Sequence, residues 1–144
     1  MNKAISILFF SLAFASCAST YTSEDIEPRT YPLQLSKIVN IRITNSGMTS
    51  PAIDDPKKYN CSNFVLSAKE VNDFFNDTMM VHENDYRHML DWSPCYVEGS
   101  MDFSDGTSAV WAIHQFKAGS IVLDSGKTVY LYCPNCKADA FVSQ

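Results

Sequence analysis

Four cysteines offer the clearest chemistry in this sequence: Cys61, Cys95, Cys133 and Cys136. Cysteine thiols can form disulfides, ligate zinc or exchange electrons as a reactive dithiol. Zinc sites usually use two close pairs of cysteines, whereas this chain has one close pair and two single cysteines. An even number of cysteines in a small protein from an oxidising compartment favours disulfides over both alternatives. We therefore predict four disulfide-bonded cysteines, provided that the protein is exported.

The first 17 residues indicate export. Lys3 precedes an apolar run over residues 4–15, which is too short for a membrane-spanning helix and is typical of a secretory signal. The end of this run, Phe14-Ala15-Ser16-Cys17, resembles the signal of bacterial lipoproteins, which are cleaved just before a cysteine that then carries lipid. The resemblance implies a lipoprotein-like signal peptide over residues 1–16 and a lipid anchor on Cys17.

The residue after Cys17 bears on where such an anchor would hold the protein. Ala18 occupies this position. In Gram-negative lipoproteins, the absence of aspartate at this position resembles a signal for sorting to the outer membrane. We therefore expect an exported protein in the periplasm, anchored to the outer membrane through lipidated Cys17. Ordinary signal cleavage after Ala18, which would discard Cys17, is the alternative.

The segment Cys133-Pro134-Asn135-Cys136 is the sharpest local motif. It resembles the CPxC motif of thioredoxin-like oxidoreductases and also the knuckle of zinc ribbons. The first resemblance implies a nucleophilic thiolate on Cys133 and a resolving thiol on Cys136. Only residues 137–144 follow the motif, which are too few for the thioredoxin fold. A structural disulfide is therefore our preferred interpretation, and a thiol–disulfide oxidoreductase is the alternative.

The spacing of apolar residues predicts a fold of the α+β class. Ser67 and Glu70 have the spacing of a capping box at the start of a helix over residues 67–80, with Val71 and Phe74 on its apolar face. Alternating apolar residues and glycine-containing turns predict strands over residues 35–44, 95–103, 108–116, 121–123 and 128–133. The last four strands form an antiparallel meander, whose middle turn we place at Ala118-Gly119. We expect one amphipathic helix packed on a four- to five-stranded antiparallel sheet.

The predicted meander also constrains the disulfide pairing. Cys95 begins its first strand and Cys133 ends its fourth, which places the two roughly 14 Å apart across three strand spacings. A disulfide needs Cα atoms within about 7 Å, so we favour the pairs Cys61–Cys95 and Cys133–Cys136. The competing arrangement joins Cys61 and Cys95 separately to the C-terminal pair.

Residues 81–92 are ambiguous between a second short helix and an ordered loop, and they contain the densest group of potential metal ligands. His82 and His88 lie six residues apart, a spacing that does not place both on one face of a helix. Glu83 and Asp85 lie between them. We interpret this group as a solvated polar segment and predict no metal and no cofactor.

The chain has the length and composition of one small domain. Residues 17–32 are polar and contain two prolines, so we expect them to form a tether to a single globular domain over residues 33–144. The net charge is −5 at pH 7, which argues against binding to the phosphate backbone of nucleic acids. The sequence contains no phosphate-binding loop, nucleophile elbow or dinucleotide fingerprint.

Aromatic residues near the predicted Cys61–Cys95 disulfide form our candidate binding surface. Trp92 and Tyr96 flank Cys95 at the start of a predicted strand, a position that suits either binding hot spots or a corner of the core. The complete candidate surface consists of Trp92, Tyr96, Tyr130, Tyr132, Asp85 and Tyr86.

These features favour a non-enzymatic binding protein of the bacterial cell envelope. A small, acidic, disulfide-stapled domain on a lipid tether suits an inhibitor or immunity-type protein that blocks another protein, such as a periplasmic enzyme or toxin. Two alternatives remain: a thiol–disulfide oxidoreductase that uses Cys133 and Cys136, and a structural lipoprotein subunit of a larger envelope assembly. We expect a protein partner, and contact with the membrane through the lipid anchor.

Overall fold

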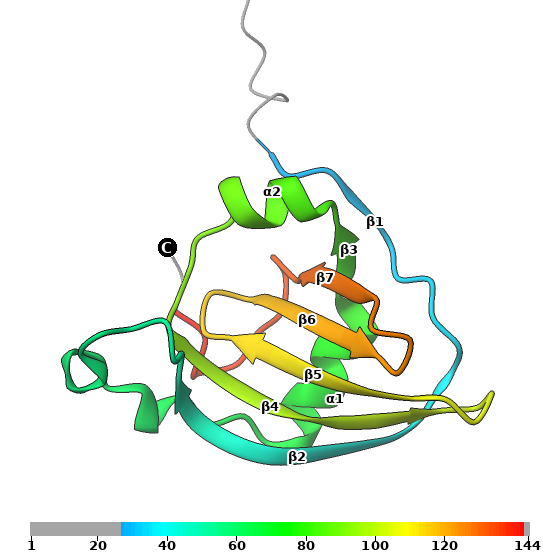
Figure 1. Cartoon of the computed structure of the whole chain (residues 1–144), viewed down its shortest axis with the longest axis horizontal. Coiled ribbons are helices and arrows are strands. Elements are labelled where there is room, and N and C mark those ends of the chain that lie inside the picture. The colour runs from blue at the N-terminus through cyan, green and yellow to red at the C-terminus, as the bar shows by residue number, and fades with distance from the viewer. Residues whose placement is uncertain (1–26, 143–144) are drawn as a thin grey trace, which may run out of the picture.

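The computed structural model describes residues 27–142, which form one sheet of seven antiparallel strands with few helices (Figure 1). The strands are β1 (Thr30–Pro32), β2 (Ile38–Thr49), β3 (Met79–Val81), β4 (Cys95–Phe103), β5 (Ser108–His114), β6 (Ala118–Leu123) and β7 (Thr128–Tyr132). Their order across the sheet is β1-β3-β7-β6-β5-β4-β2. The fold is α+β-like, as predicted, but its sheet is larger than the expected four to five strands. The predicted signal peptide, Cys17 and residues 18–26 of the predicted tether lie outside the described residues.

The longest helix, α1 (Ala68–Asp77), begins at the predicted capping box. The Ser67 hydroxyl accepts a hydrogen bond from the Glu70 backbone N–H at 3.3 Å, and the Glu70 carboxylate accepts one from the Ser67 N–H at 2.7 Å. These bonds satisfy backbone donors that the start of a helix otherwise leaves free. The helix ends before the predicted residue 80 because Met79 already pairs with β7 as part of β3.

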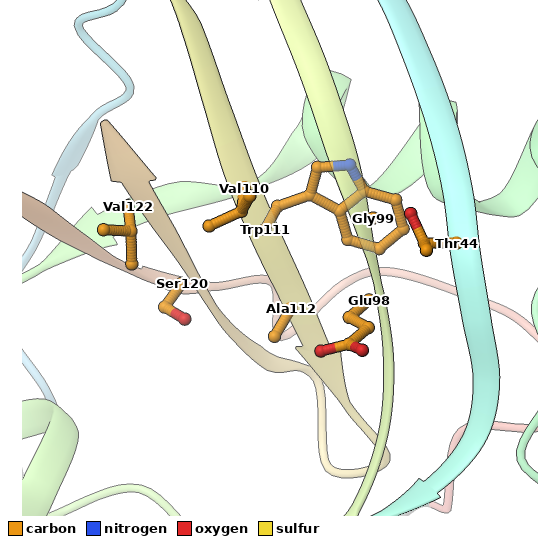
Figure 2. Close-up of a pocket in the computed structure, with 8 residues that line it drawn as sticks. All are labelled: Thr44, Glu98, Gly99, Val110, Trp111, Ala112, Ser120 and Val122. Atoms are coloured by element: carbon orange, nitrogen blue, oxygen red, sulfur yellow. The ribbon is translucent and has the colours of Figure 1, made fainter. Parts of the chain in front are cut away.

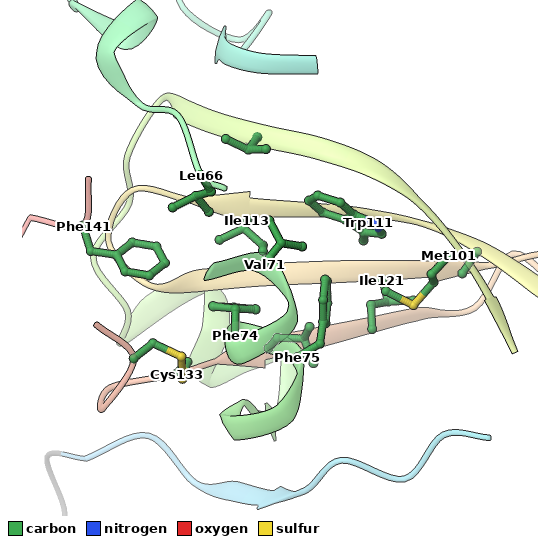
Figure 3. Packing of buried hydrophobic residues seen from close by; sticks show 14 of the residues in the cluster. Leu66, Val71, Phe74, Phe75, Met101, Trp111, Ile113, Ile121, Cys133 and Phe141 are labelled. Atoms are coloured by element: carbon green, nitrogen blue, oxygen red, sulfur yellow. A yellow bond between two sulfur atoms is a disulfide. The ribbon is translucent and has the colours of Figure 1, made fainter. Parts of the chain in front are cut away.

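The hydrophobic core lies between α1 and one face of the sheet (Figure 3). Val71, Phe74 and Phe75 of α1 are buried there. The Phe75 ring meets the Trp111 ring of β5 edge to face, with centroids 5.4 Å apart, and Phe141 packs against Phe74 at 6.3 Å. Burial of each large side chain contributes roughly 1.5–3 kcal/mol before ordering costs. This face of the sheet is therefore filled by the chain's own side chains.

Strands β4 to β7 form the predicted antiparallel meander. Two of its turns lie at the predicted glycines, Gly106 and Gly126, which have φ angles of 86° and 82°. The middle turn uses residues 115–117 and not Ala118-Gly119, so this part of the prediction is wrong. Gly119 lies inside β6, where an added Cβ would come within 3.1 Å of a phenylalanine ring of α1. This glycine therefore allows close packing and does not make a turn.

Strand β2 runs beyond the point where the sequence predicts its end. It extends to Thr49, although Asn45-Ser46-Gly47 has the composition of a turn. The pairing of β2 with β4 shifts register on both sides of Asn45, so the additional residues form β-bulges. Gly47 has a φ of 65° within this segment, a left-handed conformation that glycine adopts without strain.

Both predicted disulfides are confirmed. Cys61 and Cys95 are bonded with Cα atoms 4.9 Å apart, which joins a short 3-10 turn (Cys61–Asn63) to the start of β4. Cys133 and Cys136 are bonded just after β7 with Cα atoms 5.3 Å apart. All four cysteines are buried, so both bonds belong to the core.

Two short strands at one edge of the sheet were not predicted. β3 pairs with β7, and β1 pairs with β3. Each has three residues, too few to display the alternation that identifies a strand in a sequence. Residues 30–32 were assigned to the tether, so the part of the chain that packs with the domain begins before residue 33. Between β3 and β4 lies a second, short helix, α2 (Glu83–His88).

Candidate binding site

The sheet face opposite α1 carries most of the candidate residues. Side chains alternate along a strand, so the neighbours of the core residues point to this second face. In Figure 1, α1 lies behind the sheet and the second face, toward the viewer, is largely uncovered. We call it the open face and define it by Glu98 of β4, Val110 and Ala112 of β5, Ser120 and Val122 of β6, and Tyr130 of β7.

The centre of the open face is a hollow of about 320 Å³ (Figure 2). Val110 and Val122 provide its apolar surface, and Val110 is 58% exposed. Glu98 and Ser120 add polar groups beside them. An exposed apolar patch with a polar margin is a typical composition of a protein interaction surface.

Beneath this hollow, on the core face of the sheet, a tryptophan ring lies across a glycine. Gly99 of β4 pairs with Trp111 of β5, and Figure 2 shows the indole extending over β4 at this point. An added Cβ on Gly99 would lie 2.5 Å from the indole and 1.9 Å from the Arg42 carbonyl oxygen. The indole N–H donates a hydrogen bond to the Ser100 carbonyl at 3.0 Å. Trp111 is therefore fixed as part of the sheet and is not a free binding group.

Helix α2 covers the end of the open face next to β7. The Tyr86 ring lies against the Tyr130 ring, with centroids 4.7 Å apart. The Arg87 guanidinium donates to the Tyr130 hydroxyl at 3.1 Å and to the Glu83 carboxylate at 2.9 Å. The bond from Arg87 to Glu83, and a further one that Glu83 accepts from the Tyr130 hydroxyl, lower the pKa of Glu83. Tyr130 therefore anchors α2 to the sheet.

Asp85 of α2 binds the N-terminal segment of the domain and does not face solvent. Its carboxylate accepts two hydrogen bonds from the Arg29 guanidinium, at 2.9 and 3.0 Å, and one from the Arg29 backbone N–H at 3.0 Å. These bonds hold the pKa of Asp85 well below its usual range. Asp85 is only 2% exposed, so the prediction that it belongs to the binding surface is wrong. Its role is structural.

A second hollow, of about 430 Å³, lies between α2, the segment that follows α2, and the turn between β5 and β6. The loops that form it gather at one end of the sheet, on the left in Figure 1. Tyr86, Leu90, Trp92 and His114 are among its lining residues. Trp92 is 56% exposed and also borders a neighbouring hollow that contains Tyr59. We call residues 90–94, in which Asp91 and Trp92 are exposed, the Trp92 ridge.

His114 is the most distinctive polar group of the second hollow. Its Nδ1 lies 3.2 Å from the Ser93 carbonyl oxygen. Burial lowers the pKa of His114, an effect that the bond to Ser93 only partly opposes, so the imidazole is neutral at pH 7. Burial also raises the pKa of Tyr86 to about 12, so its hydroxyl remains protonated.

The structure brings five of the six predicted surface residues to this side of the sheet. Tyr86 and Trp92 line the second hollow directly. Tyr96 lies against the histidine of that hollow, with ring centroids 5.7 Å apart, and Tyr130 supports Tyr86. Tyr132 lies on the same face, two residues after Tyr130.

Sequence reasoning did not assign His114 to the binding surface. Its alternation with apolar neighbours in a strand is typical of a satisfied or surface histidine. Only the folded chain brings it beside α2 and the Trp92 ridge, which come from a separate part of the sequence. No local motif could have identified it.

The side chains that could support redox or metal chemistry make structural contacts. Cys133 is bonded to Cys136 and is 0% exposed, so its sulfur is not accessible to a substrate. The His82 ring accepts a hydrogen bond from the Asn84 N–H at 3.3 Å and thereby caps α2. Within residues 27–142, no three histidine, cysteine, aspartate or glutamate side chains are grouped so that they could hold a metal ion.

The fold and site define the class of this protein as a disulfide-stapled α+β domain with an open sheet face and an aromatic ridge. Comparison with known proteins finds no match, whether to a family model, a curated protein or a solved structure. In the part of the chain that the structure describes, no helix has the length and apolar character needed to cross a membrane.

Proposed function

We propose that this chain is a non-enzymatic binding protein of the cell envelope that blocks another protein, as inhibitors and immunity proteins do. The observation that carries the proposal is the Trp92 ridge. An indole that is 56% exposed stands between two hollows on a segment that leads directly into β4. Tryptophan is enriched among the residues that dominate the binding energy of protein interfaces, where it fills or borders pockets.

The support beneath the ridge strengthens the proposal. The Cys61–Cys95 disulfide fixes the start of β4, and the Ser93 hydroxyl accepts a hydrogen bond from the Cys95 N–H at 3.2 Å. The Ser93 hydroxyl also donates to the Gln115 side chain at 3.2 Å. A binding residue on a rigid support loses less conformational entropy when a partner binds. A lone exposed tryptophan would mean little, but here exposure, rigidity and adjacent hollows coincide.

The composition of the open face is also consistent with a protein partner. Val110 and Val122 place further apolar surface on this face, and Glu98 of β4 adds an acidic group beside them. The chain has a net charge of −5, which favours approach to a basic surface. A surface that combines apolar and acidic groups in this way suits the blocking of a basic protein.

The proposal places the protein in the periplasm, with a lipid on Cys17 that anchors it to the outer membrane. Its support is the lipoprotein-like end of the apolar N-terminal run and the two disulfides, which form and persist in oxidising compartments. The polar tether predicted from the sequence would join the lipid to the domain, whose packed part includes Arg29.

The oxidoreductase alternative has less support than binding. It requires an accessible thiolate on Cys133, but this sulfur is buried and bonded. The assembly-subunit alternative remains compatible with the open face, because a permanent partner would also cover Val110 and Val122. The identity of the partner, and the effect of binding on its activity, distinguish that alternative from inhibition.

Affinity capture from envelope extract tests the proposal. The bait is the full-length chain, exported with its own signal and tagged at its C-terminus, as wild type, Trp92→Ala and Tyr31→Ala. Tyr31 is a matched control, since it is also an exposed aromatic residue but lies on β1 at the sheet edge. We expect a stoichiometric partner with the wild type and Tyr31→Ala, loss of that partner with Trp92→Ala, and inhibition of the partner's activity in the complex.

Two outcomes of this experiment would count against the proposal. A partner that all three baits hold equally would show that the ridge is not the binding surface. If a Cys136→Ser bait captures partners only in the absence of reductant, Cys133 is a redox nucleophile. That result would support the oxidoreductase alternative.

A further inference from the structure

The second hollow has chemical features that identify what it would bind. We infer that it takes a neutral aromatic group with a polar hydrogen at its edge, an indole N–H or a phenol O–H, carried by a side chain of the partner protein. This inference rests on the proposed function, because it names the kind of partner residue that the Trp92 ridge would bring to the hollow.

The hydrogen-bond acceptor of the hollow is the Nε2 atom of His114. The Ser93 carbonyl oxygen can only accept a hydrogen bond, so Nδ1, which lies 3.2 Å from it, carries the proton. In a neutral imidazole the other nitrogen then presents a lone pair. Among residues 27–142 no buried side-chain nitrogen or oxygen lacks a partner, and Nε2 has no protein partner there. Nε2 therefore retains contact with solvent, and the second hollow is the one that His114 lines.

The other polar groups of the hollow restrict the ligand to a neutral donor. The Ser93 hydroxyl donates its only hydrogen to Gln115 and accepts from the Cys95 N–H, so it has no hydrogen left to donate to a ligand. Charges of both signs line the hollow, from Arg87 and Asp91, so neither a cation nor an anion is favoured. An anion would also meet the lone pair of Nε2. A neutral N–H or O–H avoids these conflicts and supplies the hydrogen that Nε2 can accept.

The walls of the hollow suit a flat ring. Tyr86, Leu90 and Trp92 present aromatic and aliphatic surfaces, against which aromatic rings pack favourably. The volume of about 430 Å³ lies within the range of sites that hold small organic groups. Trp92 also borders the neighbouring hollow with Tyr59, so the surface continues beyond the space of one small molecule. This continuity favours a side chain inserted from a larger partner over a free aromatic compound.

Two isomers test the hydrogen bond directly, because 3-methylindole keeps the ring N–H and 1-methylindole replaces it with a methyl group. Each is titrated into the mature protein in detergent, and the backbone amide resonances of residues 90–93 and His114 are followed by NMR. We expect 3-methylindole to bind roughly two- to tenfold more tightly, as one hydrogen bond allows. Equal affinities, or binding of neither isomer, would contradict the inference.

Two variants of His114 isolate the role of Nε2. His114→Asn keeps an amide N–H near the position of Nδ1 and removes Nε2, whereas His114→Gln places an amide oxygen near Nε2. The preference for 3-methylindole should disappear in H114N and return in part in H114Q, with amide spectra of the unliganded variants to verify folding. A preference that persists in H114N would overturn the assignment of Nε2.

N-acetyltryptophanamide distinguishes a protein side chain from a free aromatic compound, because it carries the indole on a peptide backbone. We expect it to bind at least as tightly as 3-methylindole. Its exclusion while 3-methylindole binds would assign the hollow to a small molecule and overturn the inference. The two claims can fail separately. If partner capture does not depend on Trp92 while the preference for 3-methylindole is retained, the proposed function fails and the inference about the hollow stands.

Discussion

At the scale of single residues, position in the fold separates binding groups from structural ones. Asp85 and Trp92 are seven positions apart and were both predicted to bind a partner. Asp85 is buried under Arg29, whereas Trp92 is exposed beside two hollows. A carboxylate and an indole look equally functional in a sequence, because their hydrogen-bond partners come from distant segments. Only the contacts of each side chain decide its role.

The Arg29–Asp85 pair predicts a defined dependence of stability on pH. The folded-state pKa of Asp85 is lowered, so the pair stabilises the fold above the ordinary carboxyl pKa of about 4 and loses this effect as pH falls further. Asp85→Asn should therefore be less stable than wild type at pH 7, with a difference that shrinks as pH falls below about 4. Urea unfolding between pH 7 and pH 2 measures this difference.

The control for this prediction is Asp139→Asn, which changes an exposed aspartate. It should leave the free energy of unfolding within about 0.5 kcal/mol of wild type, as surface substitutions usually do. A stability difference between Asp85→Asn and wild type that stays constant down to pH 2 would contradict the assigned role of the ion pair.

Gly99 gives a second prediction at the residue scale. A methyl group at this position would overlap the Arg42 carbonyl oxygen and the Trp111 ring, so β2 or β4 would have to move. We expect Gly99→Ala to lower the free energy of unfolding by about 3 kcal/mol, the upper part of the range for overpacking. Thermal and urea denaturation would measure it, with the exposed Asn135→Ala as control. A loss of unfolding free energy below about 1 kcal/mol would contradict this prediction, because it would show that β2 and β4 accommodate the methyl group at little cost.

At the scale of elements, long periodic segments could be predicted and short ones could not. The helix that starts after Ser67 and the meander from Cys95 carry strong local signals, a capping box and alternation with glycine turns. β1 and β3 have three residues each and exist only because neighbours supply their hydrogen bonds. The segment Asn45-Ser46-Gly47 has the composition of a turn, but it forms bulges because β2 continues to pair with β4. Its structure therefore also depends on a neighbouring strand.

The candidate site was predictable only where its residues carry a local sequence signal. Aromatic residues near a disulfide could be selected from the sequence, and Trp92 and Tyr86 do line the second hollow. His114 could not be selected, because its role depends on a carbonyl 21 residues away in the chain. Sequence patterns report local structure, whereas a site is assembled from distant segments.

The two disulfides predict different losses of stability. Cys61–Cys95 spans 34 residues and Cys133–Cys136 spans only three, and the loop entropy removed from the unfolded chain grows with loop length. We expect about 4 kcal/mol from replacing the first pair by alanine and about 2 kcal/mol from the second, by urea unfolding of each double variant. A larger loss from the Cys133–Cys136 pair would show that strain or packing, not chain entropy, dominates.

At the scale of the whole molecule, the proposed lipid anchor sets how the domain meets its partner. If Cys17 carries lipid, residues 18–28 span at most about 36–40 Å when fully extended, so the domain stays close to the membrane. The domain end of this tether is at Arg29, which binds α2, next to the second hollow. The binding surface would thus face partners near the membrane surface.

Fractionation of cells that produce the Cys17→Ser variant tests this arrangement. We expect the wild type in the outer-membrane fraction, and the variant shifted out of it because it lacks the acylated thiol. A variant that remains in the outer-membrane fraction as fully as wild type would contradict lipid anchoring at this residue.

The most direct test of the central claim is the affinity of the purified partner for Trp92→Ala, measured by calorimetry against wild type and Tyr31→Ala. Truncation of an interface hot spot costs about 2 kcal/mol or more, so we expect Trp92→Ala to bind roughly 30-fold more weakly or worse. Tyr31→Ala should bind within about twofold of wild type. Equal affinities for all three proteins would show that the Trp92 ridge is not the surface through which this protein acts.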